Sequence, residues 1–397
     1  YKVEDQASFF KDHLAQTTEN TFGIKVSHAE GSYIFSEDGQ KYLDLISGVA
    51  VSALGHGHPR IKGRLKEQID KHLHVRVYGE CIQSAQEDLA KELLKCLPKQ
   101  LDSFYFVNSG TEANEAALKL AKRATGRAKI VSFKGSYHGS THGSLSVSYG
   151  EQRKQSYRPL LPGIEFIGLN QFNELHQIDQ QTAAVILETI QGDAGVRIAE
   201  NDYLKALRKR CTEVGAMLIL DEIQCGMGRS GKMWAFEYAG IVPDILTMGK
   251  ALGAGLPIGA IASSKRLMSL FSRSPKLGHI TTFGGHPLPC AAAAEGLRII
   301  REEKLVDEVN AKGERFRELL QHSKIKAFRQ RGLMFAIELT SAAEVEYVVL
   351  EGLKRGLLLF WFLSTPNAFR LAPPLNIEDR DIQLGCKKIL ELLNELS

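Results

Sequence analysis

The chain from Met217 to Lys250 reads MLILDEIQCGMGRSGKMWAFEYAGIVPDILTMGK. Two short apolar runs, MLIL and ILTM, lie near its two ends. Asp221 follows the first run directly, and Lys250 follows the second after one glycine. Short apolar runs bounded by turn residues are typical of strands buried in a parallel sheet. The segment therefore predicts an α/β fold in which Asp221 and Lys250 leave successive strands close to one crevice.

The same alternation extends outward over residues 100–265. We expect strands at residues 104–107, 129–133, 184–188, 217–221, 245–248 and 259–262. Between them, residues 112–124 and 203–214 carry apolar side chains at helical spacing. Repeated strand and helix alternation predicts a mostly parallel sheet that is covered by helices on both faces.

The two ends of the chain follow a different pattern. Residues 31–44 suggest a hairpin, and residues 290–303, 305–322 and 377–396 suggest helices around strand candidates at 334–339 and 356–362. With 397 residues the chain exceeds the size of one core. We expect a large cofactor-binding domain at residues 50–295, a small α+β domain at 296–397, and an N-terminal segment, 1–49, that packs with the small domain.

The composition is that of an ordinary soluble protein. Hydrophobic residues make up 44% and charged residues 24%, and a net charge of +4 is too small to suggest nucleic-acid binding. No apolar run approaches the roughly 18 to 20 residues that span a bilayer, and the first residues lack a signal-peptide core. The six cysteines lie far apart, without zinc or redox spacing. We expect a cytoplasmic enzyme with reduced thiols.

An anion site is expected where the strand at 104–107 leads into the next helix. The connecting residues, NSGTEANE at 108–115, offer Ser109, Gly110 and Thr111 at a helix N-terminus. Free backbone N–H groups there, with the positive end of the helix dipole, suit a phosphate. Because Ser109 and Glu112 also fit a capping box, a plain helix cap is the alternative.

Asp221 and Lys250 suit an aromatic cofactor with a reactive carbonyl. A carboxylate at the end of a buried strand needs a partner, and a protonated ring nitrogen would provide one. Burial would lower the pKa of Lys250 and favour the neutral amine that forms a Schiff base. Tyr137, in KGSYHG, could stack on the ring. A helix cap or salt bridge, a solvent-directed lysine and a surface tyrosine are the alternatives.

These segments together resemble the class III aminotransferases, the ornithine and ω-amino acid enzymes of pyridoxal-phosphate fold type I. The resemblance covers nearly the whole chain. The matching segments are residues 31–44, GHGHP at 55–59, NSGTEANE at 108–115, YHG at 137–139, ETIQG at 188–192, DEIQCGMGRSG at 221–231, GKALG at 249–253, TTFGGHP at 281–287 and RLAPPL at 370–375.

The resemblance implies a seven-stranded sheet and pyridoxal 5'-phosphate held by Lys250, with Asp221 tuning its ring. Gly110 and Thr111 would bind the phosphate. Tyr137 would stack on one face of the ring and Ile223 would pack on the other, with His138 as a further cofactor-binding residue. Gln224 would reach the ring hydroxyl, and Thr282 would reach the phosphate of the neighbouring subunit. A homodimer with shared active sites follows from that last role.

The resemblance also implies ping-pong transfer of an amino group from an amino acid or ω-amine to a 2-oxo acid such as 2-oxoglutarate. Lys250, once displaced by the substrate, would act as the base. Arg370 would receive a substrate carboxylate and Glu188 would mask Arg370 for longer amines, although an ordinary ion pair is the alternative. Tyr78 is a further candidate for lining the pocket. Mutase, racemase and decarboxylase reactions use the same cofactor and remain alternatives.

One position departs from the pattern. Acetylornithine and ornithine members have an arginine where this chain has Ser140, which cannot supply a charged fork. The donor is therefore open between an ornithine-like substrate and a diamine or ω-amino acid. Residues 226–231, GMGRSG, satisfy a dinucleotide fingerprint, but they do not follow the strand directly, which disfavours a nicotinamide-dependent dehydrogenase. No metal site is expected, because the histidines lack carboxylates or thiols at ligand spacing.

Overall fold

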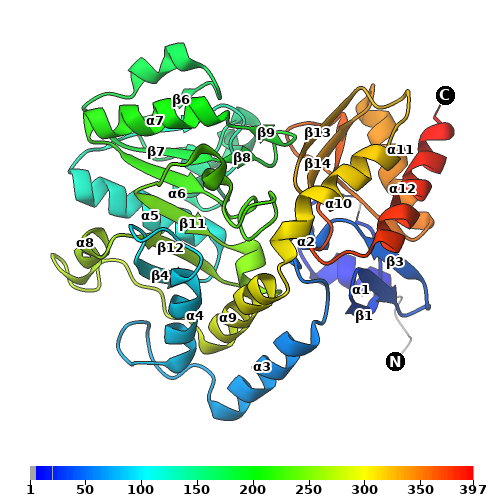
Figure 1. Ribbon diagram of the computed structural model, residues 1–397, viewed down its shortest axis with the longest axis horizontal. Helices are drawn as coiled ribbons and strands as arrows, with labels where there is room; N and C mark the ends of the chain where they lie inside the picture. Colours follow the sequence, from blue (N-terminus) through cyan, green and yellow to red (C-terminus); the bar gives the residue numbers. More distant parts are fainter. Residues whose placement is uncertain (1–5, 20, 397) are drawn as a thin grey trace.

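A computed structural model describes residues 6–19 and 21–396 of the protein. Figure 1 shows two parts side by side. The middle of the chain forms a large sheet with its helices, and the two chain ends together form a smaller part. In the described residues, no helix combines the length and the apolar character that a bilayer crossing requires. Nor do these residues contain a cluster of three or more His, Cys, Asp or Glu side chains able to hold a metal ion.

The large part is built on a seven-stranded sheet of order β4-β12-β11-β10-β7-β5-β6. The strands are β4 (Ser103–Val107), β5 (Lys129–Phe133), β6 (Ile164–Ile167), β7 (Thr182–Glu188), β10 (Met217–Asp221), β11 (Ile245–Met248) and β12 (Gly259–Ser263). The mostly parallel sheet is confirmed. Only β12 is antiparallel to its neighbours, because the connection from β11 contains just the short 3-10 helix η5 (Lys250–Gly253) and is too short for a crossover.

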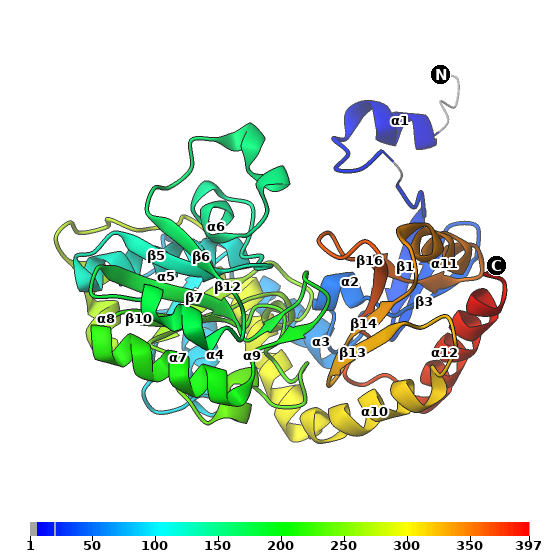
Figure 2. The same cartoon turned by 90° about the horizontal axis from the view of Figure 1, so that it is seen from above.

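Alternate side chains of the strands pack on two separate layers of helices. Ile219 of β10 packs with α5 (Gly110–Thr125), whereas Leu218 and Leu220 pack on the opposite face with α7 (Asn201–Val214). Figure 2 shows α7 running along one side of the strands. Because side chains alternate along a strand, Asp221 lies on the same face as Ile219. The sheet therefore directs Asp221 toward α5.

The smaller part joins the two ends of the chain. An antiparallel sheet of order β13-β14-β17-β16 packs with α10 and α11, which in turn contact α12, and a second sheet has the order β1-β2-β3-β15. β3 and β15 pair in parallel, with Leu43 opposite Leu357. The elements are β1 (Val26–Glu30), β2 (Tyr33–Ser36), β3 (Lys41–Asp44), α10 (Leu305–Leu319), β13 (Ala327–Arg331), β14 (Met334–Glu338), α11 (Ala342–Lys354), β15 (Leu357–Leu358), β16 (Phe360–Trp361), β17 (Ala368–Leu371) and α12 (Asp379–Asn394). The N-terminal strands thus share a sheet with the C-terminal region.

The remaining elements connect these layers. α9 (Pro287–Glu302) packs with α3 and α4 and runs through the expected boundary at residue 295, so the domain limits stay a prediction. The other elements are α1 (Gln6–His13), α2 (Ser47–Ala50), α3 (Pro59–Lys71), α4 (Ser84–Leu94), α6 (His142–Val147), η1 (Glu151–Arg153), η2 (Gln155–Tyr157), η3 (Phe172–Gln177), β8 (Ile190–Gln191), β9 (Arg197–Ile198), η4 (Ala235–Ala239), α8 (Lys265–Met268) and η6 (Ser269–Ser272).

Candidate active site

A cavity of about 280 Å³ opens where β10 and β11 end, next to the N-terminus of α5. Most of the residues expected at the site line this one cavity. They are Gly110, Thr111, Tyr137, His138, Glu188, Asp221, Ile223, Gln224 and Lys250, and the lining is completed by Gly139 and Ser140. Ser109, Tyr78, Arg370 and Thr282 lie outside that lining. The adjacent parallel strands β10 and β11 thus bring Asp221 and Lys250 together, as the sequence predicted.

Asp221 is buried and surrounded by donors. One carboxylate oxygen accepts a hydrogen bond from Asn114 Nδ2 at 2.9 Å and pairs with His138 Nδ1 at 2.7 Å. The other accepts from the backbone N–H of Ile223 at 3.1 Å. Neither His138 Nε2 nor Asn114 Oδ1 has a hydrogen-bond partner in the part of the chain that the structure describes. These contacts fix the carboxylate at the strand end, facing the cavity.

Lys250 lies at the start of η5, with φ of 48° in the left-handed region. Only a few per cent of residues other than glycine adopt such a backbone, and it often marks a functional position. Burial lowers the pKa of the Lys250 amine, while the charges of Asp221 and Glu188 act in the opposite direction. The site thus favours the neutral amine more than solvent does.

The N-terminus of α5 forms the corner expected for an anion. Ser109 caps this helix, because its hydroxyl accepts from the backbone N–H of Glu112 at 3.3 Å, and the Glu112 carboxylate accepts from the Asn108 N–H at 2.7 Å. Ser109 is therefore a helix cap, the alternative that its spacing from Glu112 had suggested. Gly110 and Thr111 line the cavity instead.

Two glycines, Gly110 and Gly139, line the cavity at the N-terminus of α5, where a side chain would not fit. A Cβ atom at Gly110 would lie 2.9 Å from Cδ1 and Cγ2 of Ile223. At Gly139, where φ is 131°, a Cβ atom would lie 2.3 Å from Thr111 Oγ1. Tight backbone approach of this kind suits a bound phosphate and the ring attached to it. A buried amine, a carboxylate, a helix N-terminus and flanking side chains in one cavity fit pyridoxal phosphate.

Arg370 forms a salt bridge with a carboxylate other than Glu188. Arg370 Nη2 pairs with Asp193 Oδ1 at 3.2 Å, an ion pair that the sequence did not predict, and the masking of Arg370 by Glu188 when a longer amine enters stays a prediction. Glu188 instead accepts from the backbone N–H groups of Tyr137 at 2.8 Å and Gly192 at 3.1 Å. Burial raises the pKa of Glu188 to about 7.

Sequence reasoning also missed the neighbours of Arg370. Asp193 accepts hydrogen bonds from Arg153, Leu363 N and Ser364 Oγ as well. Asp193 directly follows the ETIQG segment at 188–192, so the sequence contains two carboxylates, Glu188 and Asp193, close together as candidates for a partner of Arg370. Arg153 lies in the η1 segment, where no motif marked it.

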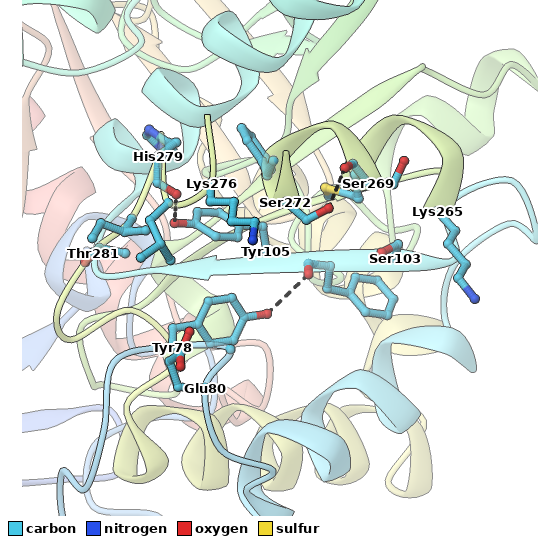
Figure 3. Close-up of a pocket in the computed structure, with 16 residues that line it drawn as sticks. Tyr78, Glu80, Ser103, Tyr105, Lys265, Ser269, Ser272, Lys276, His279 and Thr281 are labelled. Carbon is cyan, nitrogen blue, oxygen red and sulfur yellow. Dashed lines mark hydrogen bonds between the residues drawn. The ribbon is translucent and has the colours of Figure 1, made fainter. Parts of the chain in front are cut away.

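Tyr78 and Thr282 lie at a different surface. Tyr78 lines a second, larger cavity of about 620 Å³ together with Tyr105 and Thr281. Figure 3 shows its hydroxyl directed at the backbone oxygen of Phe104, at 3.3 Å, and its ring lies edge-on to Tyr105. Thr282 is exposed beside this surface. Within one chain, the structure does not bring Tyr78 to Lys250.

The glycine motif at residues 226–231 does not form a dinucleotide site. It makes a buried turn in which Arg229 donates to the backbone oxygens of Leu333 and Pro373. The element that follows is the 3-10 helix η4, so the α-helix N-terminus that would hold a pyrophosphate is missing at this point of the described chain.

Comparisons with known proteins agree with this geometry. The family model of the class III aminotransferases matches residues 14–393. An acetylornithine aminotransferase of Archaeoglobus fulgidus is 38% identical over 96% of this chain and 98% of its own. A [LysW]-aminoadipate semialdehyde/glutamate semialdehyde transaminase of Sulfurisphaera tokodaii is 37% identical over 86% and 90%. The ornithine aminotransferase structure from Toxoplasma gondii superposes with a TM-score of 0.89 at 29% identity, covering 99% of this chain and 96% of that chain.

Proposed function

The chain belongs to the class III aminotransferases, which depend on pyridoxal phosphate, and on that premise we propose that Lys250 carries the cofactor and Arg370 receives a substrate carboxylate. One observation carries the proposal. Lys250 and Asp221 leave adjacent parallel strands and line one cavity, in which burial favours the neutral amine. When bound, the cofactor supplies an electron sink for the substrate carbon that loses a proton.

The chain's own residues position the reactants and move the proton. Asp221, fixed by its donors, places negative charge at the ring nitrogen. The N–H groups of Gly110 and Thr111 would hold the phosphate at the start of α5. Tyr137 and Ile223, which line the cavity, would enclose the ring. Once the substrate amine takes its place on the cofactor, the amine of Lys250 would act as the base that removes a proton from the substrate carbon.

We propose an ornithine-like donor, with a terminal amine and a carboxylate on one chain, and 2-oxoglutarate as acceptor. The names of two relatives give acetylornithine and [LysW]-aminoadipate semialdehyde as substrates. Arg370 supports a carboxylate-bearing donor, since it is buried close enough to Lys250 for its charge to act on that amine. A diamine or a simple ω-amino acid stays open, because Ser140 gives no charge to a distal group.

The attachment of the cofactor is tested by borohydride reduction. We expect reduction of the loaded protein to fix the cofactor on the peptide that contains Lys250, and the Lys250→Ala variant to fold but lose the label and multiple turnover. Lys154 is the matched control, because burial also lowers its pKa while it lies outside the cavity lining. The Lys154→Gln variant should keep the label. A label on any other lysine refutes the proposal.

The donor class is tested with a panel read as glutamate formed from 2-oxoglutarate. The panel contains ornithine, N-acetylornithine, putrescine and 4-aminobutyrate. We expect turnover with donors that carry a carboxylate and little with putrescine, and Arg370→Gln should raise KM for the former. Turnover that is fastest with putrescine and insensitive to Arg370→Gln contradicts the ornithine-like assignment.

We also propose a homodimer in which Thr282 serves the site of the partner subunit. Leu277, which lines the larger cavity, is 60% exposed, and Ile82 and Phe283, close in sequence to other lining residues, are 91% and 55% exposed; a second copy of the chain would cover such apolar side chains. Mixing Lys250→Ala with Thr282→Ala subunits should restore activity above that of either parent, because one site of each hybrid is then intact. A mixture that only averages its parents contradicts the shared site.

The cytoplasm is the compartment that we propose. Six free cysteines, four of them buried, fit a reducing environment. Fractionation of cells that produce the protein tests this, and recovery outside the cytoplasm contradicts it.

A further inference from the structure

Arg153 is a second guanidinium near the Lys250 cavity, outside its lining but in contact with the lining residue Tyr137. It lies in η1, and its Cζ atom is 5.3 Å from the ring centroid of Tyr137, which lines the cavity. Stacking of a guanidinium on an aromatic face orients the planar group. Arg153 therefore approaches, from a later segment of the chain, the region where Ser140 supplies no charge.

Asp193 bridges Arg153 and Arg370. Its Oδ2 atom accepts from Arg153 Nη2 at 2.5 Å, and its Oδ1 atom accepts from Arg370 Nη2 at 3.2 Å. Although burial disfavours its charged form, contact with Arg153 lowers the pKa of Asp193. The charge of Glu188 also raises the pKa of Arg370. Burial, however, raises the pKa of Glu188 to about 7, and Glu188 makes no ion pair in the described residues. The two guanidiniums of Arg153 and Arg370 thus pair with a single carboxylate, that of Asp193.

One nitrogen of Arg153 is left without an acceptor. Nη2 donates to Asp193 and, at 2.8 Å, to Ser364 Oγ, which uses both of its hydrogens. Nη1 is buried and has no hydrogen-bond partner among the described residues. A buried donor of a charged group without a partner is costly, and a carboxylate would satisfy it through a charge-assisted hydrogen bond. The free nitrogen and the excess positive charge both indicate an anionic ligand.

Resting on the aminotransferase function above, we propose that Arg153 binds the second carboxylate of a dicarboxylic substrate, the class of 2-oxoglutarate and glutamate. Arg370 receives the other carboxylate, and Asp193 holds both guanidiniums in place when no substrate is bound. Arg153 is then a specificity-determining residue, which favours substrates with two carboxylates over those with one. A purely structural role, tying residues 363–364 to Asp193, is the competing explanation.

The test measures binding of two unreactive acids of equal carbon number to the cofactor-loaded protein by calorimetry. Glutarate has two carboxylates and valerate has one. Arg153→Gln should weaken glutarate binding by ~10- to 100-fold and leave valerate within ~3-fold, since only glutarate uses the second guanidinium. Arg153→Lys should recover part of the loss. Arg158→Gln is the matched control, because Arg158 lies on the same segment but is exposed and paired only with Glu151 in the described residues.

Each outcome decides the matter. Equal weakening of glutarate and valerate in Arg153→Gln indicates the structural role and overturns the proposal. So does unchanged glutarate binding, or a wild-type protein that does not prefer glutarate. In turnover, the variant should raise KM for 2-oxoglutarate but not for pyruvate. Failure of borohydride labelling at Lys250 would contradict the proposed cofactor attachment. The calorimetric comparison of glutarate with valerate tests the role of Arg153 by a different measurement.

Discussion

The Gly110→Ala variant tests whether the wall of the cavity is shaped for the cofactor. The new Cβ atom would lie 2.9 Å from Cδ1 and Cγ2 of Ile223, whereas carbon atoms in contact lie about 3.5–4.0 Å apart. Ile223 must therefore withdraw by roughly 0.6–1 Å. Without the cofactor it can move into the cavity of about 280 Å³ at little cost. With the ring in place, that space is filled.

The expected loss is one of cofactor affinity rather than of folding. Overpacking of this kind costs ~1–3 kcal/mol, which corresponds to ~5- to 150-fold weaker binding of pyridoxal phosphate. The apoprotein should unfold in urea within about 0.5 kcal/mol of the wild type. Titration of both apoproteins with the cofactor, followed by absorbance and fluorescence, gives the two dissociation constants.

Gly63→Ala is the matched control for this substitution. Gly63 lies inside α3, and its Cβ atom would meet nothing within 4 Å. The same change there should stabilise the fold by ~0.5–1 kcal/mol and leave cofactor affinity unaltered. The reasoning is refuted if Gly110→Ala binds the cofactor within ~2-fold of the wild type, or if its apoprotein is as strongly destabilised as the loaded protein.

Three further predictions concern stability. Burial raises the pKa of Glu188 to about 7, so the folded apoprotein keeps a proton that the unfolded chain releases, and stability falls by up to ~3 kcal/mol as pH rises from about 5 to 7. Glu188→Gln should remove that fall in urea titrations, and an unchanged slope contradicts it. Ser341→Ala, which removes the hydroxyl that accepts from Glu344 N at 3.2 Å, should cost ~1 kcal/mol in urea unfolding with kcat unchanged; a changed kcat contradicts a capping role. Trp234→Phe should cost ~2–4 kcal/mol, because the indole donates to the Cys96 oxygen inside the core, and a loss below ~1 kcal/mol contradicts it.

The central strands could be predicted because burial on both faces makes them continuously apolar. β10 and β11 have this character, and Asp221 and Lys250 followed from them. Two of the strands that were missed are different, whereas β17 was missed although it is buried. β13, AFRQR, is only half-buried and carries two arginines, and β6 is the last strand of its sheet and is partly exposed. An edge or a half-covered strand does not need apolar side chains, so its sequence contains little signal.

The surroundings of Arg370 were beyond sequence reasoning for another reason. Glu188 and Asp193 stand in one short segment, and which of them meets Arg370 depends on how the chain turns between them. Glu188 ends β7, where its carboxyl is taken up by backbone N–H groups, while Asp193 follows β8 and reaches Arg370 and Arg153. A pairing across three distant segments follows from tertiary packing, which a linear motif does not encode.

Burial acts in opposite directions on the ionisable groups of the cavity. It lowers the pKa of the Lys250 amine and raises that of the Glu188 carboxyl, so both groups are shifted toward their neutral forms by the same exclusion of water. Asp221 accepts hydrogen bonds from the side chains of Asn114 and His138 and from the backbone N–H of Ile223. Glu188 accepts only from the backbone N–H groups of Tyr137 and Gly192, so the two carboxyl groups of this cavity differ in the kind of donor that holds them. It follows that the reactivity of Lys250 depends on the depth of the cavity as much as on any single neighbour.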